Sequence, residues 1–295
     1  MKKMSMGDRV YSLVISIIAV IVVIIAAYPV IYVVSASFSD PSEIALGHVT
    51  LLPKGFSLSA YGKVIKNSNM LLGFRNTIYY SVLGTAINIV LTLFAAYALS
   101  KPEMVGRNII TILITFTMFF SGGMIPAYLN LKSLHMLNTT WALVLPGAIS
   151  VTNMLIVRNY ITNSIPQEII DAAEIDGCSL IRTLLKIIVP LAKPVIAVVF
   201  IYYFSGHWNS YFSALLYIRD RGRYPLQVFL REILLVNQMA TLGETMSLGD
   251  DGSQALLFEA MKYAVIVVSS IPVIIMYPFI QKNFAKGIMI GSVKG

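Results

Sequence analysis

The sequence predicts an all-α membrane protein with about six transmembrane helices. Hydrophobic residues make up 57% of the 295 residues and charged residues only 12%, whereas a soluble domain carries roughly 25% charged residues. The mean hydropathy is +0.77. The charged residues are also spaced so that six long apolar windows lie between them. Such a chain has too little polar surface to stay dissolved alone.

Each of the six windows lacks Asp, Glu, Lys and Arg over about the length of a bilayer crossing, which takes roughly 20 helical residues. Backbone groups inside lipid must bond internally, so a helix is the expected conformation of each window. The windows are residues 10–39, 76–100, 108–131, 133–157, 194–218 and 263–281. In the third window, Ser121-Gly122-Gly123 and Pro126 either break the helix and open a cavity or permit close helix packing.

The first window is expected to be a retained membrane anchor. Basic residues precede it, and Ser35-Ala36-Ser37 offers the small residues of a cleavage site. However, a signal peptide has an apolar core of roughly 7–15 residues, and the apolar run at 10–34 is much longer.

The net charge of +8 does not indicate nucleic-acid binding, because the 22 basic residues are scattered between apolar runs. Such residues are typical of positions beside lipid headgroups. The single cysteine, Cys178, excludes an intrachain disulfide.

Sequence signatures of catalysis are missing. The three histidines are widely spaced and form no H-E-x-x-H pattern, and the chain has no G-x-x-x-x-G-K-[ST] phosphate loop. If ATP drives this protein, the ATP and its Mg²⁺ are expected on another chain, and no cofactor or metal is expected here. The six windows contain no Asp or Glu, which argues against a proton-coupled carrier but not against sodium coupling through backbone carbonyls.

Six spans place both termini on one side of the membrane, and the distribution of Lys and Arg weakly favours the cytoplasm for that side. Residues 40–75 and 219–262 then form long external connections. The second is expected to contain a helix over 226–236 and a polar stretch through Asp250-Asp251-Gly252. These connections either carry binding functions or are plain solvated linkers.

One long connection, residues 158–193, lies on the same side as the termini. Ser164 is expected to cap a helix that has Pro166 and Glu168 in its first turn. Gly177 fits a helix stop. A second helix is expected from residue 179 to residue 189, where it meets Pro190.

The first helix of this connection suits docking into a partner protein. It offers apolar, small and acidic side chains: Ile169, Ile170 and Ile175; Ala172 and Ala173; Glu168, Asp171, Glu174 and Asp176. The alternative is a helix lying on lipid headgroups, but such helices are usually rich in Lys and Arg. Anionic lipid repels acidic charge, so a protein partner is favoured.

The same residues resemble a motif of ATP-binding-cassette importer permeases, which is E-A-A, three residues, G, nine residues and I-x-L-P. The sequence has Asp171-Ala172-Ala173, then Gly177, then Ile187, Val189 and Pro190 at this spacing. Asp171 replaces Glu and Val189 replaces Leu, and both changes keep the charge or the apolar character. In that family the loop is a cytoplasmic coupling helix that docks into the ATPase. The resemblance implies a coupling role for Glu168, Asp171, Ala172, Ala173, Asp176, Gly177, Ile187 and Pro190.

Further stretches are similar to permeases of the carbohydrate type. They are Arg75-Asn76-Thr77, Ala95-Ala96-Tyr97-Ala98, Gly106-Arg107, Trp208-Asn209, Tyr224-Pro225-Leu226 and the tail GIMIGSVKG at 287–295. The tail is similar to that of the smaller permease subunit of maltose and polysaccharide-oligosaccharide importers, such as those for alginate oligosaccharides.

The resemblance implies that residues 1–295 form a single permease domain in a bacterial cytoplasmic (inner) membrane, with cytoplasmic termini. It also implies a second and different permease chain, an ATPase dimer and an external solute-binding protein as partners. The alternatives are a secondary carrier that works without an ATPase and a membrane scaffold with no pathway. Neither alternative needs an ATPase-docking helix between its spans.

Polar residues inside the windows are candidates for the translocation pathway. Trp208 and Tyr211 could stack on sugar rings while Asn209 bonds their hydroxyls, and Asn153 is a further candidate. Other polar residues that stand out are Asn88, Thr92 and His207. The alternative for each is an aromatic belt or a hydrogen bond between helices.

Overall fold

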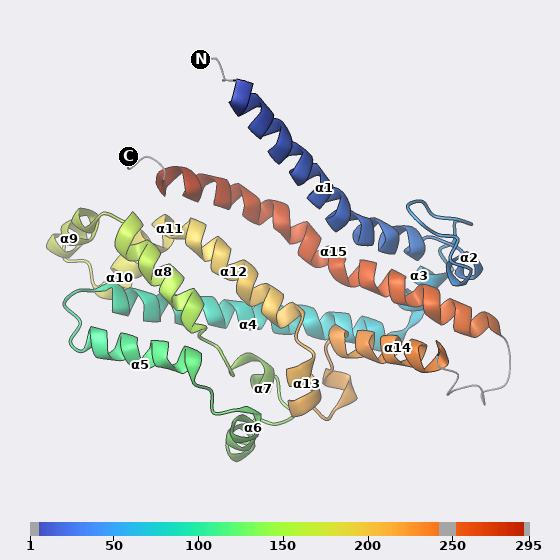
Figure 1. Ribbon diagram of the computed structural model, residues 1–295. Coiled ribbons are helices and arrows are strands. Elements are labelled where there is room, and N and C mark those ends of the chain that lie inside the picture. The colour runs from blue at the N-terminus through green and yellow to red at the C-terminus, as the bar shows by residue number, and fades with distance from the viewer. Residues whose placement is uncertain (1–5, 242–251, 292–295) are drawn as a thin grey trace. The chain divides into compact units, whose positions relative to one another are not determined.

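The computed structural model describes residues 6–241 and 252–291, and all its regular elements within these residues are helices (Figure 1). The prediction of an all-α membrane protein is confirmed. The chain divides into two compact units, of which the first is Met1–Met70 with Leu230–Ile271 and the second is Leu71–Phe229 with Pro272–Gly295.

Three helices of the described chain are each long and apolar enough to cross a membrane. The spans lie at Val10–Ser37 in α1 (Met6–Ser37), at Ser68–Ser100, which is α4, and at Glu259–Met276 in α15 (Gly252–Gly291). Two bent pairs pass the same test together: α5 (Arg107–Phe119) with α6 (Met124–Ser133), and Leu180–Leu191 with α12 (Lys193–Trp208). If each bent pair is one span, the described residues contain up to five.

The continuous helix expected over residues 133–157 does not form. α6 ends at Ser133, α7 covers only Trp141–Val144, and α8 covers Val151–Ser164. Asn138 has φ 60° and Gly147 has φ 72°. A left-handed residue interrupts a right-handed helix, so these two positions divide the fourth window into short pieces.

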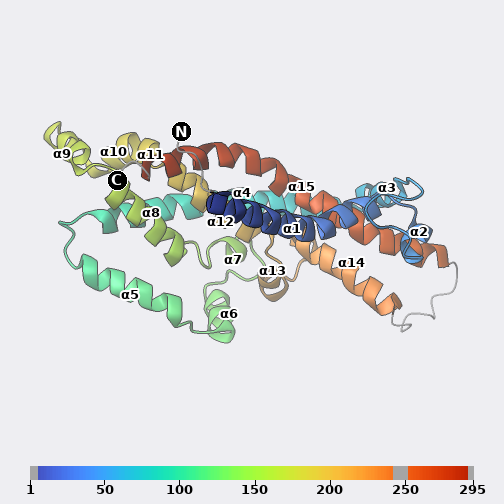
Figure 2. The same cartoon turned by 45° about the horizontal axis from the view of Figure 1, so that its top comes forward.

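The third window contains the break that Ser121-Gly122-Gly123 suggested. α5 ends at Phe119, Gly123 has φ 87°, and α6 begins at Met124. The axes of α5 and α6 differ by 115°, a turn that is visible in Figure 2.

In the first unit, the end of α1 is held by the chain that follows it. The hydroxyl of Tyr61 on α3 (Ser59–Lys66) donates to Ser37 Oγ at 2.8 Å. The ring of Phe38 stacks on those of Tyr61 and Phe56, with centroids 5.0 and 5.9 Å away. The connection at 40–75 is therefore partly helical, because it also contains α2 (Pro41–Ala45).

The second predicted external connection contains α14 (Leu226–Thr241), so the helix expected at 226–236 is confirmed and runs further. Asp250 and Asp251 lie outside the described residues.

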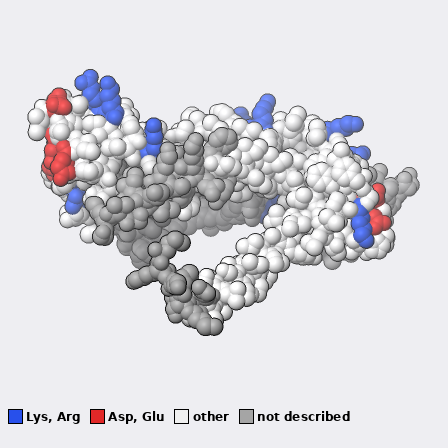
Figure 3. Space-filling view, turned by 90° about the horizontal axis from the view of Figure 1, so that it is seen from above, with Lys and Arg blue, Asp and Glu red and all other residues white. Residues whose placement is uncertain are grey.

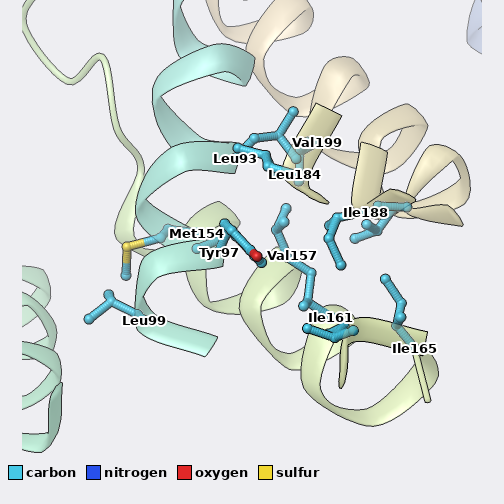
Figure 4. Close-up of a cluster of buried hydrophobic side chains, with 14 of the residues drawn as sticks. Leu93, Tyr97, Leu99, Met154, Val157, Ile161, Ile165, Leu184, Ile188 and Val199 are labelled. Carbon is cyan, nitrogen blue, oxygen red and sulfur yellow. The ribbon is translucent and has the colours of Figure 1, made fainter. Parts of the chain in front are cut away.

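A hydrophobic core organises the second unit (Figure 4). Its side chains come from α4, from α8, from α9 (Gln167–Ile175), from the π-helical turn η1 (Leu184–Ile188) and from α12. The largest fully buried members are Met154, Ile161, Leu184 and Ile188. The predicted connection at 158–193 is thus packed onto the spans and is not a free loop.

Candidate functional site

The turn from α8 into α9 places the predicted docking helix. Ser164 does not cap α9, as the sequence suggested, because it is the last residue of α8. Ile165 is extended, with φ −102° and ψ 119°, since a residue before proline avoids the helical region. Pro166 then stands at the N-cap of α9, and Gln167 Nε2 donates to Asp171 Oδ1 at 2.9 Å.

The end of α9 matches the helix stop predicted at Gly177. This residue has φ 73°. Its N–H donates to Glu174 O at 3.0 Å, and the N–H of Cys178 donates to Ala173 O at 2.9 Å. This pair of bonds is the Schellman arrangement, which needs a left-handed residue and so favours glycine.

The second predicted helix is present in three short pieces. Ser179 caps α10 (Leu180–Thr183), η1 follows, and α11 (Val189–Leu191) completes the segment. Pro190 does not end this helix at 189, because it occupies one of the first two positions of α11, where its missing N–H is tolerated. The chain bends by 85° just after Leu191.

The two faces of α9 differ sharply. Ile170 and Ala173 are 4% and 5% exposed, so they pack against their own chain. Ile175 is 86% exposed and Ile169 is 40% exposed. Ala172 is exposed too, so of the two alanines expected to meet a partner, only Ala172 is on the accessible surface.

Acidic side chains surround this exposed apolar surface. Glu168, Asp171, Glu174 and Asp176 are all exposed. In Figure 3 a group of Asp and Glu side chains lies at the left-hand end, where Figures 1 and 2 place α9. The exposed part of α9 therefore carries apolar and acidic side chains together.

An ion pair ties α9 to the end of α4. The Lys101 ammonium group binds the Glu174 carboxylate and lies over the Tyr97 ring, 5.8 Å from its centroid. Burial lowers the pKa of Lys101, but the hydrogen bond and the charge of Glu174 outweigh this effect and leave the pKa above its usual value. Lys101 therefore stays charged at neutral pH.

The same end of α4 is also joined to α8. Arg158 Nε donates to Leu99 O at 2.9 Å, which satisfies one of the carbonyls that a helix end leaves unpaired. α4 is thus fastened to both the helix before and the helix after the turn at Pro166.

A cavity of about 610 Å³ lies in the second unit, between α4, the chain around Gly147, and helices α8, α12 and α13 (Phe212–Tyr217). None of its lining residues is Asp, Glu, Lys or Arg. Polar residues that line it include Asn88, Ser150, Thr152, Asn153, Tyr202, Tyr203, His207, Ser210 and Ser213.

Of the four candidate pathway residues, Asn153 lines this cavity. Trp208 is 1% exposed and packs against the rings of Phe74 and Phe204, at 5.8 and 5.6 Å. Asn209 Nδ2 donates to Ser205 O within its own helical turn, at 2.9 Å. Tyr211 is 37% exposed. The structure therefore does not bring the four residues together.

Two hydrogen-bonded chains of residues fix the walls of the cavity. Asn88 Nδ2 donates to Ala148 O at 2.6 Å, and Asn88 Oδ1 pairs with His207 Nε2 at 2.7 Å. The Tyr203 hydroxyl accepts from Ser150 N at 3.0 Å. The sequence singled out Asn88 and His207 as polar residues in apolar windows but gave no signal for Ser150 or Tyr203, because these windows are far apart along the chain.

His207 also explains a glycine in α4. A Cβ added at Gly84 would lie 2.4 Å from His207 Nε2, so only glycine lets the imidazole ring approach α4 this closely. Within residues 6–241 and 252–291, no group of three or more His, Cys, Asp or Glu is placed to hold a metal ion.

The chain is similar to known proteins along nearly its whole length. Protein LplC of Bacillus subtilis is 42% identical over 272 residues, which is 92% of this chain and 90% of that protein. The polygalacturonan/rhamnogalacturonan transport system permease protein YtcP of Bacillus subtilis is 38% identical and covers 98% of this chain and 100% of its own length.

A crystal structure of a bacterial ABC transporter involved in the import of the acidic polysaccharide alginate contains a similar chain. It is 34% identical, has a TM-score of 0.85, and covers 96% of this chain and 100% of that one. Residues 6–290 match the family described as binding-protein-dependent transport system inner membrane components. Together with the helical fold and its membrane spans, this match shows that the chain belongs to that family.

Proposed function

We propose that this permease subunit forms half of the translocation pathway of an ATP-driven oligosaccharide importer. Relatives at 38% and 34% identity are named for polygalacturonan/rhamnogalacturonan transport and for the import of alginate. The other half of the pathway is a second, different permease chain, as the similarity of the tail at 287–295 to a smaller permease subunit suggests.

Coupling to ATP hydrolysis runs through α9, which docks into a separate ATPase. The exposed Ile175 within an acidic surface carries this proposal. Ile175 is 86% exposed although its chain neighbours Ile170 and Ala173 are buried. An exposed isoleucine beside four carboxylates suits a partner that offers an apolar pocket with a basic rim.

The proposal fixes the orientation of the chain. α9 must face the cytoplasm, because the ATPase that drives import lies there. With the six crossings expected from the sequence, both termini lie on that side too. Residues 40–75 and 219–262 face the external binding protein.

The test is a reconstituted transporter with its ATPase, its second permease and its binding protein. Ile175→Asp should strongly reduce the stimulation of ATP hydrolysis by the loaded binding protein, and Ile175→Val should keep it. Burying one such side chain contributes about 1.5–3 kcal/mol, so docking should weaken by roughly tenfold or more. Normal stimulated hydrolysis by Ile175→Asp, or uptake that continues without the ATPase, would favour a secondary carrier instead.

A further inference from the structure

The cavity described above lies at the start of a helix that begins inside a predicted apolar window. The chain leaves helix α7 before Pro146 and Gly147 and re-enters a helix at Val151. Pro146, Gly147, Ser150, Thr152 and Asn153 all line the cavity. The first backbone N–H groups of any α-helix have no acceptor within the helix, and they carry a partial positive charge.

Asn153 adds a buried polar side chain without a partner. It is 6% exposed and lines the cavity. Its backbone N–H donates to Ser150 Oγ, but its side-chain amide makes no hydrogen bond to any residue that the structure describes. Its amide atoms are not fully buried, because they open onto the cavity, where they are available to bond a ligand.

The surroundings of this helix start are held rigidly. Because Asn88 Nδ2 donates to Ala148 O, the Asn88 Oδ1 atom is left to accept from His207 Nε2. Tyr203 bonds both Ser150 N and Thr92 Oγ1, at 3.0 and 2.6 Å. The N–H groups of Ser150 and Asn153 are already bonded within the protein, so those of Val151 and Thr152 remain for a ligand, on a helix start whose flanking residues are fixed by hydrogen bonds.

We propose that this cavity is a subsite for the carboxylate of an acidic sugar, held by the N-terminus of α8 and the side-chain amide of Asn153. Helix starts that lie at membrane depth are suited to anionic groups of substrates. No Asp or Glu lines the cavity to repel a carboxylate, and no Lys or Arg lines it to trap the carboxylate and prevent its release. The imidazole of His207, which also lines the cavity, is already bonded to Asn88.

This assignment rests on the proposed function, since it names the substrate class of the same pathway. It adds to that function the claim that this subunit itself recognises the negative charge of the substrate. A cavity that served only for packing, or only for neutral sugars, would not distinguish a uronate from its methyl ester.

Occupancy of the cavity can be measured without transport. In the assembled transporter with Cys178→Ser, a Ser213→Cys variant puts one thiol of this chain at the cavity wall. The rate at which N-ethylmaleimide alkylates this thiol is measured with trigalacturonate, trimannuronate or triguluronate, and with the methyl ester of each. At least one uronate should slow alkylation by about tenfold, and its methyl ester should not.

Asn153→Asp is the decisive substitution, because it puts a negative charge where the carboxylate binds. It should weaken protection by the uronate by about tenfold, which corresponds to about 1.4 kcal/mol. Asn130→Asp on α6 is the matched control, since Asn130 is exposed and outside the cavity lining, and it should leave protection unchanged.

The proposal is overturned if no uronate protects the thiol, if the methyl esters protect equally well, or if Asn153→Asp keeps full protection. If any of these results is found while stimulated ATP hydrolysis is normal, only the carboxylate subsite is rejected. The proposal that α9 couples to the ATPase then still stands. Normal stimulated hydrolysis by Ile175→Asp, with uronate protection of the thiol intact, would be the opposite outcome, because it would reject docking through α9 and keep the subsite.

Discussion

The ion pair between Lys101 and Glu174 should transmit the movement of α9 to α4. Glu174 is on the docking helix, and Lys101 directly follows the last residue of α4. If the ATPase pulls on α9, this pair is a polar link through which α4 can follow. Glu174→Lys should therefore uncouple the transporter.

The size of the effect follows from the exposure of the two side chains. Lys101 is 13% exposed and Glu174 is 50% exposed. A fully exposed pair contributes about 0.2–1 kcal/mol, and breaking a fully buried one costs about 3–5 kcal/mol. This pair falls between the two cases, so a loss of roughly 1–2 kcal/mol is expected, which is a factor of about 5–30 in an equilibrium.

The assay is ATP hydrolysis in proteoliposomes with and without the loaded binding protein. Glu174→Lys and Lys101→Glu should each reduce stimulated hydrolysis about 5–30-fold, whereas the double variant should recover most of it. Lys101→Glu should not rescue Glu168→Lys, which changes an exposed carboxylate on the same helix. If the double variant is as poor as the product of the two single losses, the link does not exist.

Three further predictions concern the packing of α9, the close approach of His207 to α4, and the orientation of the chain. Ala173→Trp should lower both the melting temperature and stimulated hydrolysis, because this alanine is 5% exposed. Ala172→Trp should lower only stimulated hydrolysis. Equal melting temperatures of the two variants would contradict this difference. Gly84→Ala should destabilise the protein by about 1–3 kcal/mol, because its Cβ would lie 2.4 Å from His207; an unchanged melting temperature would show that the ring moves freely. An impermeant maleimide added to intact cells should not label Cys178, and it should do so after permeabilisation; labelling from outside would reverse the proposed orientation.

Patterns that are local in the sequence predicted local structure well. The charge-free windows predicted the long helices α1 and α4, and the motif around Gly177 predicted α9 and the residue at which it stops. These signals depend on residues within one or two turns of each other, so no tertiary information was needed.

Predictions that depended on tertiary packing were less successful. Apolar composition suggested one helix over 133–157, but left-handed Asn138 and Gly147 divide this window. Ala172 and Ala173 are the same residue type side by side, so the sequence does not tell which is buried. The packing of α9 on its own chain shows that Ala173 is.

The cavity shows the same limit. Its residues come from three windows, and Asn88 and His207, which are bonded to each other at its wall, are 119 positions apart in the chain. Sequence reasoning named Trp208 and Asn153 alike as pathway candidates, and only the structure separates them, because it buries the Trp208 ring and places Asn153 at the cavity wall.

The most direct test of α9 docking is site-specific photo-crosslinking in the assembled transporter. A photoreactive residue is placed at Ile175, which is 86% exposed, or at Ile170, which is 4% exposed on the same helix. If α9 docks through its exposed face, position 175 should crosslink to the ATPase, and position 170 should crosslink much more weakly or not at all. Crosslinking to lipid alone from position 175, in a transporter that hydrolyses ATP normally, would contradict docking through this surface.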